Sequence, residues 1–152
     1  MRRREFVLGV GGLVARPIVA QAQHKAGVRT VGVLMGYAEN DPEGQARLTA
    51  FRKGLQKLGW TEGRNIRIEY RWAASDTEAM QRFAKEFVVL QPDLIFTTAT
   101  PATAAMLQQT RTIPIVFAGV SDPVGSGFVA SFPRPGGNVT GFITMEPTMA
   151  GK

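Results

Sequence analysis

The sequence predicts a three-layer α/β protein in which one parallel sheet lies between two layers of helices. Short apolar runs alternate with stretches whose apolar residues recur at helical spacing, a pattern typical of repeated β-α-β units. Three of the short runs are apolar on both faces, as central strands are when helices cover both sides of a sheet. The chain has 152 residues, of which 44% are hydrophobic and 20% are charged, and this is enough for one domain with a core.

The first strand and helix are expected between residues 30 and 58. Thr30 to Met35 (TVGVLM) is an apolar run that predicts the first strand. The helix is indicated by apolar residues at spacings of 3, 4 and 3, namely Leu48, Phe51, Leu55 and Leu58. We expect it to run from about Glu43 to Leu58 and to end at Gly59, which adopts the left-handed conformation without steric cost.

The second strand and helix have a different pattern. Residues 66 to 72 (IRIEYRW) alternate apolar and charged side chains, which predicts a strand with one solvated face at the edge of the sheet. A second stripe with 3, 4, 3 spacing follows, formed by Met80, Phe83, Phe87 and Leu90. Ser75 or Asp76 is the expected N-cap of this helix, and Pro92 ends it.

The remaining elements complete a doubly wound sheet. We expect strands at Asp93 to Thr98 and at Ile113 to Ala118, with an alanine-rich helix at Pro101 to Thr110 between them. A short helix at Val124 to Ser131 and a fifth strand at Val139 to Ile143 follow. An edge second strand beside central first, third and fourth strands fits the order 2-1-3-4-5.

Residues 1 to 22 resemble an export signal. A basic start is followed by a modest apolar stretch, and residues 20 to 22 (AQA) have the small-x-small form of a cleavage site. Arg3 and Arg4 precede hydrophobic residues as in twin-arginine signals, and a general secretory signal is the alternative. A disordered basic arm or a nucleic-acid-binding tail is a further alternative.

The net charge of +6 is concentrated in the first 22 residues. That segment contains four of the 18 basic residues and one acidic residue, so the rest of the chain has 14 basic and 11 acidic side chains, a net +3. A charge of this size needs no polyanionic partner, and we expect no nucleic-acid binding. The sequence has no cysteine, one histidine (His24) and no nucleophile motif, phosphate loop or paired carboxylates. We therefore expect no metal, no cofactor and no enzymatic activity.

The predicted strand order gathers the loops after the strands at the carboxyl edge of the sheet, where open α/β sheets bind ligands. Thr100 and Pro101 begin a helix there, with Thr100 as the expected N-cap, and the free N–H groups of its first turn favour an anion such as a carboxylate. The hydroxyls of Thr97, Thr98 and Thr100 can donate to that anion or accept from an ammonium. Helix capping alone is the alternative explanation.

Two further loops reach the same edge. Ser121 and Asp122 follow the fourth strand, and Asp122 either binds a ligand amine or caps the next helix. Tyr37 and Asn40 follow the first strand, and they either stack on and hydrogen-bond to a ligand or are ordinary surface residues.

Segments along the whole chain match one protein family in order. They are MRRREF at 1 to 6, AQAQ at 20 to 23, VGVL at 31 to 34, AFRKGLQKLGW at 50 to 60, EGRNIRIEYRWA at 62 to 73, ATPAT at 99 to 103, TIPIVF at 112 to 117 and DPVGSGFVASFPRPGGNVTGF at 122 to 142. With these segments the chain resembles the bacterial ABC-transporter substrate-binding proteins of the tryptophan/tyrosine uptake type.

The resemblance implies one lobe of a type I periplasmic-binding-protein fold, in which two α/β lobes close on a small ligand and deliver it to an ABC permease at the membrane. It implies a periplasmic location and an amino-acid-like ligand, with aromatic amino acids bound by known relatives. The ligand contacts it implies are Tyr37, Thr98, Thr100, Pro101, Ser121 and Asp122. Members of the family are longer, so we expect a signal at residues 1–22, a linker at 23–29, the ligand-binding lobe at 30–144 and a truncated crossover toward a missing second lobe at 145–152.

Two other classes of protein share this fold. A small α/β enzyme or flavodoxin-like domain would need a nucleophile, phosphate loop or acidic cluster, which the sequence does not show. The ligand-binding core of a transcription regulator would need a helix-turn-helix ahead of the first strand, and the glycine- and proline-containing segment before residue 28 does not predict one.

Overall fold

The fold is a five-stranded parallel sheet with helices on both faces. The computed structural model describes residues 27–143, so the predicted signal at 1–22 and the terminal segment at 145–152 lie outside the described residues. The strands have the predicted order, β2-β1-β3-β4-β5, and each neighbouring pair is parallel. The elements are β1 (Arg29–Met35), α1 (Pro42–Lys57), β2 (Ile66–Trp72), α2 (Thr77–Leu90), β3 (Leu94–Thr98), α3 (Thr100–Gln109), β4 (Ile115–Ala118) and β5 (Val139–Phe142).

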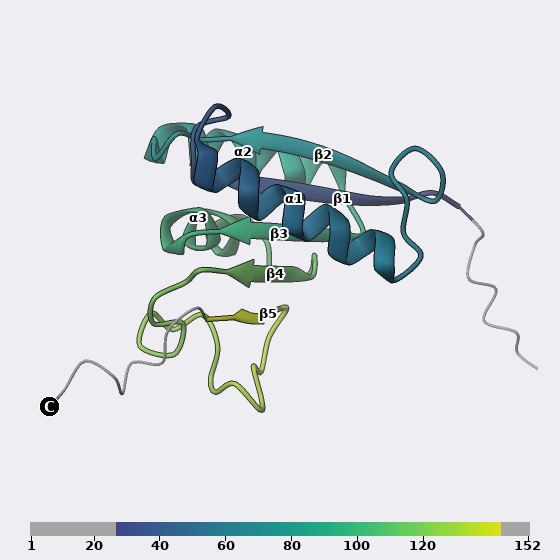
Figure 1. The fold of residues 1–152 in the computed structure, drawn as a ribbon. Coiled ribbons are helices and arrows are strands. Elements are labelled where there is room, and N and C mark those ends of the chain that lie inside the picture. The colour runs from purple at the N-terminus through teal and green to yellow at the C-terminus, as the bar shows by residue number, and fades with distance from the viewer. Residues whose placement is uncertain (1–26, 144–152) are drawn as a thin grey trace, which may run out of the picture.

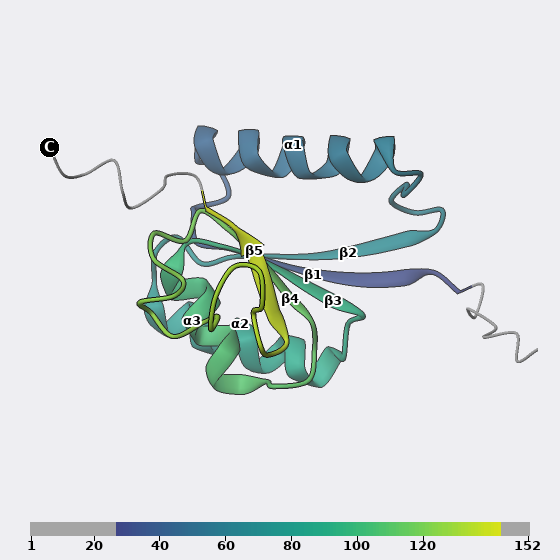
Figure 2. The ribbon, with the colours of Figure 1, turned by 90° about the horizontal axis from the view of Figure 1, so that it is seen from below.

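The helices form two unequal layers (Figures 1 and 2). α1 lies alone on one face of the sheet, and α2 and α3 lie side by side on the other face. All five strands point in the same direction, so their carboxyl ends meet at one edge of the sheet (Figure 1). No helix within residues 27–143 combines the length and the apolarity that a membrane span requires.

The face covered by α2 and α3 holds the larger part of the core. Its fully buried side chains include Leu34, Phe87, Ile95, Met106 and Phe117. Burying one such side chain stabilises the fold by about 1.5–3 kcal/mol. A Cβ atom at Gly32 in β1 would lie 2.8 Å from the Phe87 ring, so the glycine allows α2 to approach the sheet this closely.

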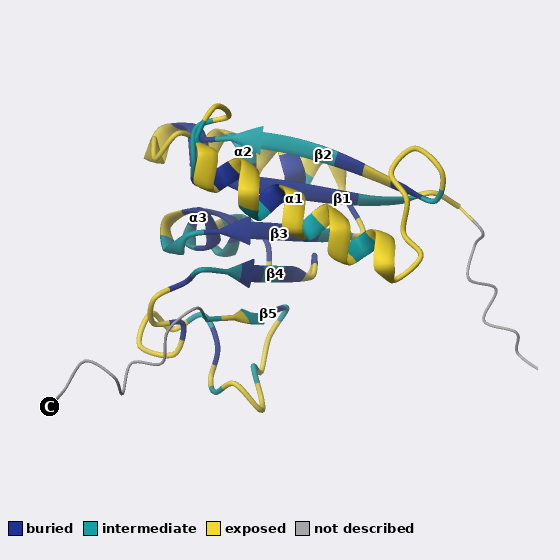
Figure 3. Cartoon of the chain, in the orientation of Figure 1, coloured by how far each residue is buried: buried dark blue, intermediate teal, exposed yellow. Residues whose placement is uncertain are grey.

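The face covered by α1 has a smaller core. Leu48 of α1 is buried on the sheet, and Phe51 stacks on Phe96 of β3 with ring centroids 4.4 Å apart and planes at 12°. Figure 3 shows the central strands largely buried and the outer surface of α1 exposed. At the far edge of the sheet, Phe142 of β5 is 73% exposed.

Acidic side chains cap the first two helices. The Asp41 carboxylate accepts hydrogen bonds from the first-turn amides of α1, and Asp76 does the same for α2, which decides between Ser75 and Asp76 as the cap. α1 ends at Lys57, with Leu58 as its C-cap, and Gly59 follows with a φ of 88°, which is left-handed as predicted.

The predicted helix at Val124 to Ser131 is absent, which corrects that expectation. The chain there makes a single turn, because Gly127 (φ 72°) takes the left-handed conformation that ends a helix. The amide of Phe128 donates to the carbonyl of Pro123 and that of Gly127 to Val124, both at 2.9 Å. The β4 strand also begins later than predicted, at Ile115, because Pro114 has no N–H to donate to a sheet ladder.

Candidate functional site

The loops that follow β1, β2, β3 and β4 meet at the carboxyl edge of the sheet. They comprise residues 36–40, 73–75, 98–101 and 119–122, which we call the carboxyl rim. This is the edge at which the strand order predicts ligand binding.

Hydrogen bonds join these loops to one another. The amide of Ser75 donates to the carbonyl of Gly36 at 2.8 Å, and the amide of Gly36 donates to Thr98 Oγ1 at 3.1 Å. The amide of Ser121 donates to Thr100 Oγ1 at 3.4 Å. The carboxyl rim is therefore one connected structure.

The backbone of the carboxyl rim contains unfavourable conformations. Ala74 (φ 50°), Ser75 (φ 62°) and Ala99 (φ 73°) are non-glycine residues with positive φ, and Gly119 (φ 70°) follows β4 in the same way. Ala99 also has ψ 151°, which places it in a region that is almost exclusive to glycine. Such residues cost about 1–3 kcal/mol each and cluster at binding and catalytic sites.

Helix α3 begins one residue earlier than predicted. Thr100 was expected to be the N-cap, but it is the first helical residue, and Ala99 occupies the N-cap position. The prediction is wrong because the chain turns at Ala99, whose amide donates to the carbonyl of Ala118, and the Thr100 hydroxyl accepts from Ser121 instead. No side chain caps α3, so its first-turn amides are not occupied by a cap, and Pro101 is exposed beside them.

Thr98 is the buried base of the carboxyl rim, and Thr97 precedes it in β3. Thr98 is 1% exposed, and its hydroxyl accepts from Gly36, which links the ends of β1 and β3. Thr97 is fully buried, and its hydroxyl lies 2.8 Å from that of Thr103 in α3. The structure therefore gives both hydroxyls a role in positioning the rim, while Thr100 is half-buried at its surface.

The loop after β4 presents polar groups to solvent. Ser121 and Asp122 are both exposed. Asp122 Oδ1 accepts from the amide of Gly125 at 2.8 Å, which is the capping role that the sequence left open for this residue.

Tyr37, in the loop after β1, is half-buried against the start of α1. A Cβ atom at Gly44 of α1 would lie 2.8 Å from the Tyr37 Cβ, so the absence of a side chain at position 44 allows Tyr37 to pack against the helix. Asn40, in the same loop, is exposed.

Sequence reasoning missed Arg47, which extends from α1 to the carboxyl rim. Its Nε and Nη2 donate to Glu43 Oε1 at 3.1 and 2.6 Å, and its guanidinium carbon lies 5.7 Å from the centre of the Tyr37 ring. A Cβ atom added at Gly119 would lie 3.2 Å from Arg47 Nη1. The hydrogen bond to Glu43 raises the pKa of Arg47 above its usual range, although partial burial opposes the shift, and the residue is cationic.

The sequence signal for Arg47 is limited to the i,i+4 spacing from Glu43, which indicates a surface ion pair on a helix. Its proximity to Gly119 depends on how α1 packs against β4, which the spacing does not reveal. Arg47 and the carboxyl rim together provide a cation, an uncapped helix start and an aromatic ring, a set of groups suited to an aromatic anion. No cluster of three or more metal-ligating side chains occurs within residues 27–143.

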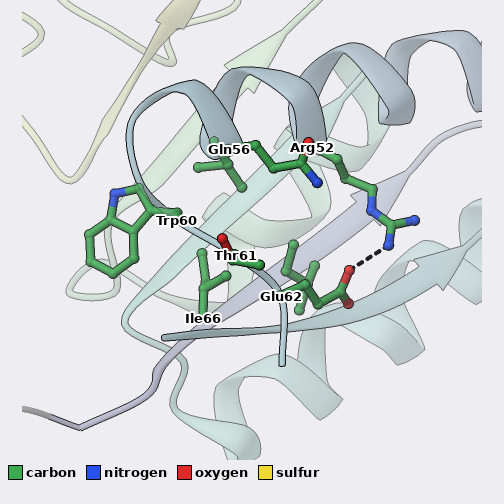
Figure 4. A pocket seen from close by; sticks show the side chains of 8 residues that line it. Arg52, Gln56, Trp60, Thr61, Glu62 and Ile66 are labelled. Atoms are coloured by element: carbon green, nitrogen blue, oxygen red, sulfur yellow. Dashed lines mark hydrogen bonds and ion pairs between the residues drawn. The ribbon is translucent and has the colours of Figure 1, made fainter. Parts of the chain in front are cut away.

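A separate cavity of about 120 Å³ lies between the C-terminal half of α1 and β2, away from the carboxyl rim. Its labelled lining residues in Figure 4 include Trp60 and Ile66, and Arg52 pairs with Glu62 at 2.7 Å on one side of it. The hydroxyl of Tyr70 also donates to Glu62, at 3.0 Å. These contacts connect α1 to the loop that leads into β2.

Comparison with known proteins agrees with this architecture. A tyrosine-binding protein from Clostridioides difficile (strain R20291) is 37% identical over 102 residues, covering 65% of this chain and 30% of that protein. A ligand-free, open structure of a substrate-binding protein with adhesive properties from Clostridium difficile is 38% identical, with a TM-score of 0.70 over 75% of this chain and 38% of that one. The structure of an ABC domain in complex with L-Trp from Streptococcus pneumoniae is 27% identical, with a TM-score of 0.71 over 76% of this chain and 38% of that one.

The chain therefore spans between 30% and 38% of the length of these relatives. The family described as ABC transporter substrate binding protein matches residues 38–150. This match decides against the enzyme alternative, because the family is one of substrate-binding proteins. The chain belongs to the ABC transporter substrate-binding proteins, and its fold is that of one lobe of a periplasmic binding protein.

Proposed function

We propose that the carboxyl rim forms one wall of a site that captures an aromatic amino acid for uptake by an ABC transporter. The observation that carries this proposal is the convergence of the half-buried Tyr37 and the uncapped start of α3 at the same edge of the sheet. An amino acid presents a carboxylate, an ammonium and a side chain, and this edge offers a group for each. The names of two relatives, one tyrosine-binding and one in complex with L-Trp, support the ligand class.

The proposed contacts have different tasks. Tyr37 packs against the ligand side chain, the half-buried Thr100 and the exposed Ser121 contact its polar groups, and the exposed Pro101 contacts the ligand beside them. Asp122 attracts the ammonium with the carboxylate oxygen that does not cap the following turn. Thr98 acts from below, by holding the loop at Gly36 in place.

We further propose that the ligand is enclosed by a second lobe, supplied by sequence corresponding to the remaining length of the relatives. A single wall leaves a small ligand largely hydrated, whereas ligand sites normally bury most of the ligand surface. We also propose that the protein is exported by a signal at residues 1–22 and that its partner is an ABC permease.

The test is a titration of the chain with L-tryptophan and L-leucine, followed through amide chemical shifts. We expect weak but saturable shifts at the carboxyl rim with L-tryptophan and smaller ones with L-leucine. A chimaera in which the remaining part of the Clostridioides difficile tyrosine-binding protein follows residue 143 should bind more tightly. The proposal fails if neither amino acid shifts any rim resonance in either protein.

A further inference from the structure

Arg47 of α1 extends to the carboxyl rim and has unused hydrogen-bonding capacity. A guanidinium has five N–H donors, and Glu43 occupies the edge formed by Nε and Nη2. Within residues 27–143, Nη1 has no hydrogen-bond partner, so the second edge, formed by Nη1 and Nη2, is available. An edge of this shape binds a carboxylate through two parallel hydrogen bonds.

The free edge of Arg47 lies toward the rim. Nη1 lies beside Gly119, which follows β4 and precedes the exposed Ser121 by two residues. The guanidinium is also positioned over the Tyr37 ring from the loop after β1. Arg47 therefore lies between two loops that both belong to the proposed ligand wall.

Other contacts hold Arg47 in this orientation. Its side chain is 32% exposed. Glu43, one turn earlier on α1, accepts hydrogen bonds from the edge formed by Nε and Nη2. The position of Gly119 also matters, because a side chain there would lie 3.2 Å from Nη1. A guanidinium fixed by an acidic partner and an aromatic ring loses little side-chain entropy when it binds a ligand.

We infer that Arg47 binds the carboxylate of the amino acid ligand through its Nη1–Nη2 edge, between the Tyr37 ring and Gly119. This inference rests on the proposed function and specifies its ligand as a compound with a free carboxylate. It predicts that an amino acid amide, which has the same ring and ammonium but no negative charge, binds more weakly.

Arg52 provides a matched control on the same helix. It pairs with Glu62 at 2.7 Å (Figure 4). It also lies over the Tyr70 ring at 5.9 Å, so its environment resembles that of Arg47. Its contacts are with residues of the β2 side, at the end of α1 that is remote from the rim. If the loss of any arginine from α1 changes ligand binding, variants at both positions will show the change. If Arg47 binds the carboxylate, only the variant at Arg47 will lose the preference for a ligand with a carboxylate.

The experiment compares the affinities of L-tryptophan and L-tryptophanamide, measured by amide chemical shifts in the wild-type chain and its variants. We expect L-tryptophan to bind wild type roughly tenfold to hundredfold more tightly than the amide, as charge-assisted hydrogen bonds imply. Arg47→Met should abolish this preference, and Arg52→Met should retain it. Equal weakening of both ligands in Arg47→Met would overturn the inference, because that is the effect of a purely structural role.

A second variant tests the inference independently of whether Arg47→Met folds. Arg47→Lys keeps the charge but not the planar fork, and we expect a carboxylate preference below that of wild type. A wild-type preference in Arg47→Lys would contradict binding through two nitrogens. If wild type binds neither ligand, the proposed function fails, whereas binding of both without a carboxylate preference contradicts only the role of Arg47.

Discussion

At the scale of single residues, Ala99 shows how local strain and position in the fold are connected. It has φ 73° and ψ 151°, a conformation that costs an alanine about 1–3 kcal/mol but is accessible to glycine. Its neighbours keep it there, because its amide bonds to Ala118 across the sheet and the following residue begins α3. The strain is thus fixed by the sharp turn between β3 and α3.

Ala99→Gly is expected to stabilise the chain by about 1 kcal/mol, since relief of strain exceeds the entropy that glycine adds to the unfolded state. Urea unfolding measures this change. Ala104→Gly, in the interior of α3, is the matched control and should destabilise by about 1 kcal/mol. Destabilisation by both substitutions would show that Ala99 is not strained.

Tyr70 gives a second prediction at this scale. Burial and the hydrogen bond to Glu62 raise the pKa of Tyr70 to about 12, whereas a tyrosine in an unfolded chain ionises near pH 10. Between these values the unfolded state releases a proton that the folded state keeps, so the free energy of unfolding falls as the pH rises from about 10 to about 12. Tyr70→Phe should lose less stability than wild type across this window in urea unfolding. An identical pH dependence in the two proteins would contradict the raised pKa.

At the scale of elements, the structure identifies Asp76 as the N-cap of α2, whereas the sequence left both Ser75 and Asp76 as candidates. Asp76 accepts from the amides of Glu78 and Ala79 at 2.9 and 3.2 Å, while Ser75 has a left-handed backbone outside the helix. We expect Asp76→Ala to lower the free energy of unfolding by about 1 kcal/mol. Ser75→Ala is the control and should have a smaller effect in thermal unfolding. A larger loss in Ser75→Ala would reverse the assignment of the cap.

Most of the elements could be predicted because their signals are local. Leu48, Phe51 and Leu55 repeat at helical spacing, and the alternation in β2 identifies an edge strand without reference to any other element. The failures depend on backbone conformation and on contacts between elements. Gly127 ends the turn after β4, and the start of α3 depends on the bond between Ala99 and Ala118, so neither boundary is encoded in the nearby apolar pattern.

The candidate site also contains features with local sequence signals and features that depend on contacts between distant elements. The predicted strand order matches the structure, so the sequence alone places Tyr37, Ser121 and Asp122 in the loops at the carboxyl edge of the sheet. Burial of Thr98 and the reach of Arg47 to Gly119 depend on packing between elements distant in sequence. One sequence read by itself does not contain that information.

At the scale of the whole molecule, the two faces of the sheet are covered unequally. α1 is the only helix on its face within the described residues, and β5 at the edge carries Phe142 with 73% of its surface exposed. A large apolar side chain on an edge strand favours association between chains.

Phe142→Ser is therefore expected to reduce self-association at high protein concentration, measured by sedimentation velocity. Val89→Ser is the control, because Val89 is 84% exposed but lies on a helix, where no unpaired strand edge adjoins it. Equal effects of the two substitutions would show that exposure alone, and not the edge strand, governs association.

The hydrogen bonds that connect the loops of the carboxyl rim have a thermodynamic consequence. Because Ser75, Gly36 and Thr98 are bonded in series, these loops are ordered when the protein folds and not when a ligand arrives. The entropy cost of ordering the loops is then part of the folding free energy. Ligand binding does not include this cost, so more of the interaction free energy with the ligand contributes to affinity. Replacing Thr98 by alanine would move that loss from folding to binding. In the proposed site, where Thr98 acts by holding the loop at Gly36, this substitution should make the binding entropy of the ligand less favourable.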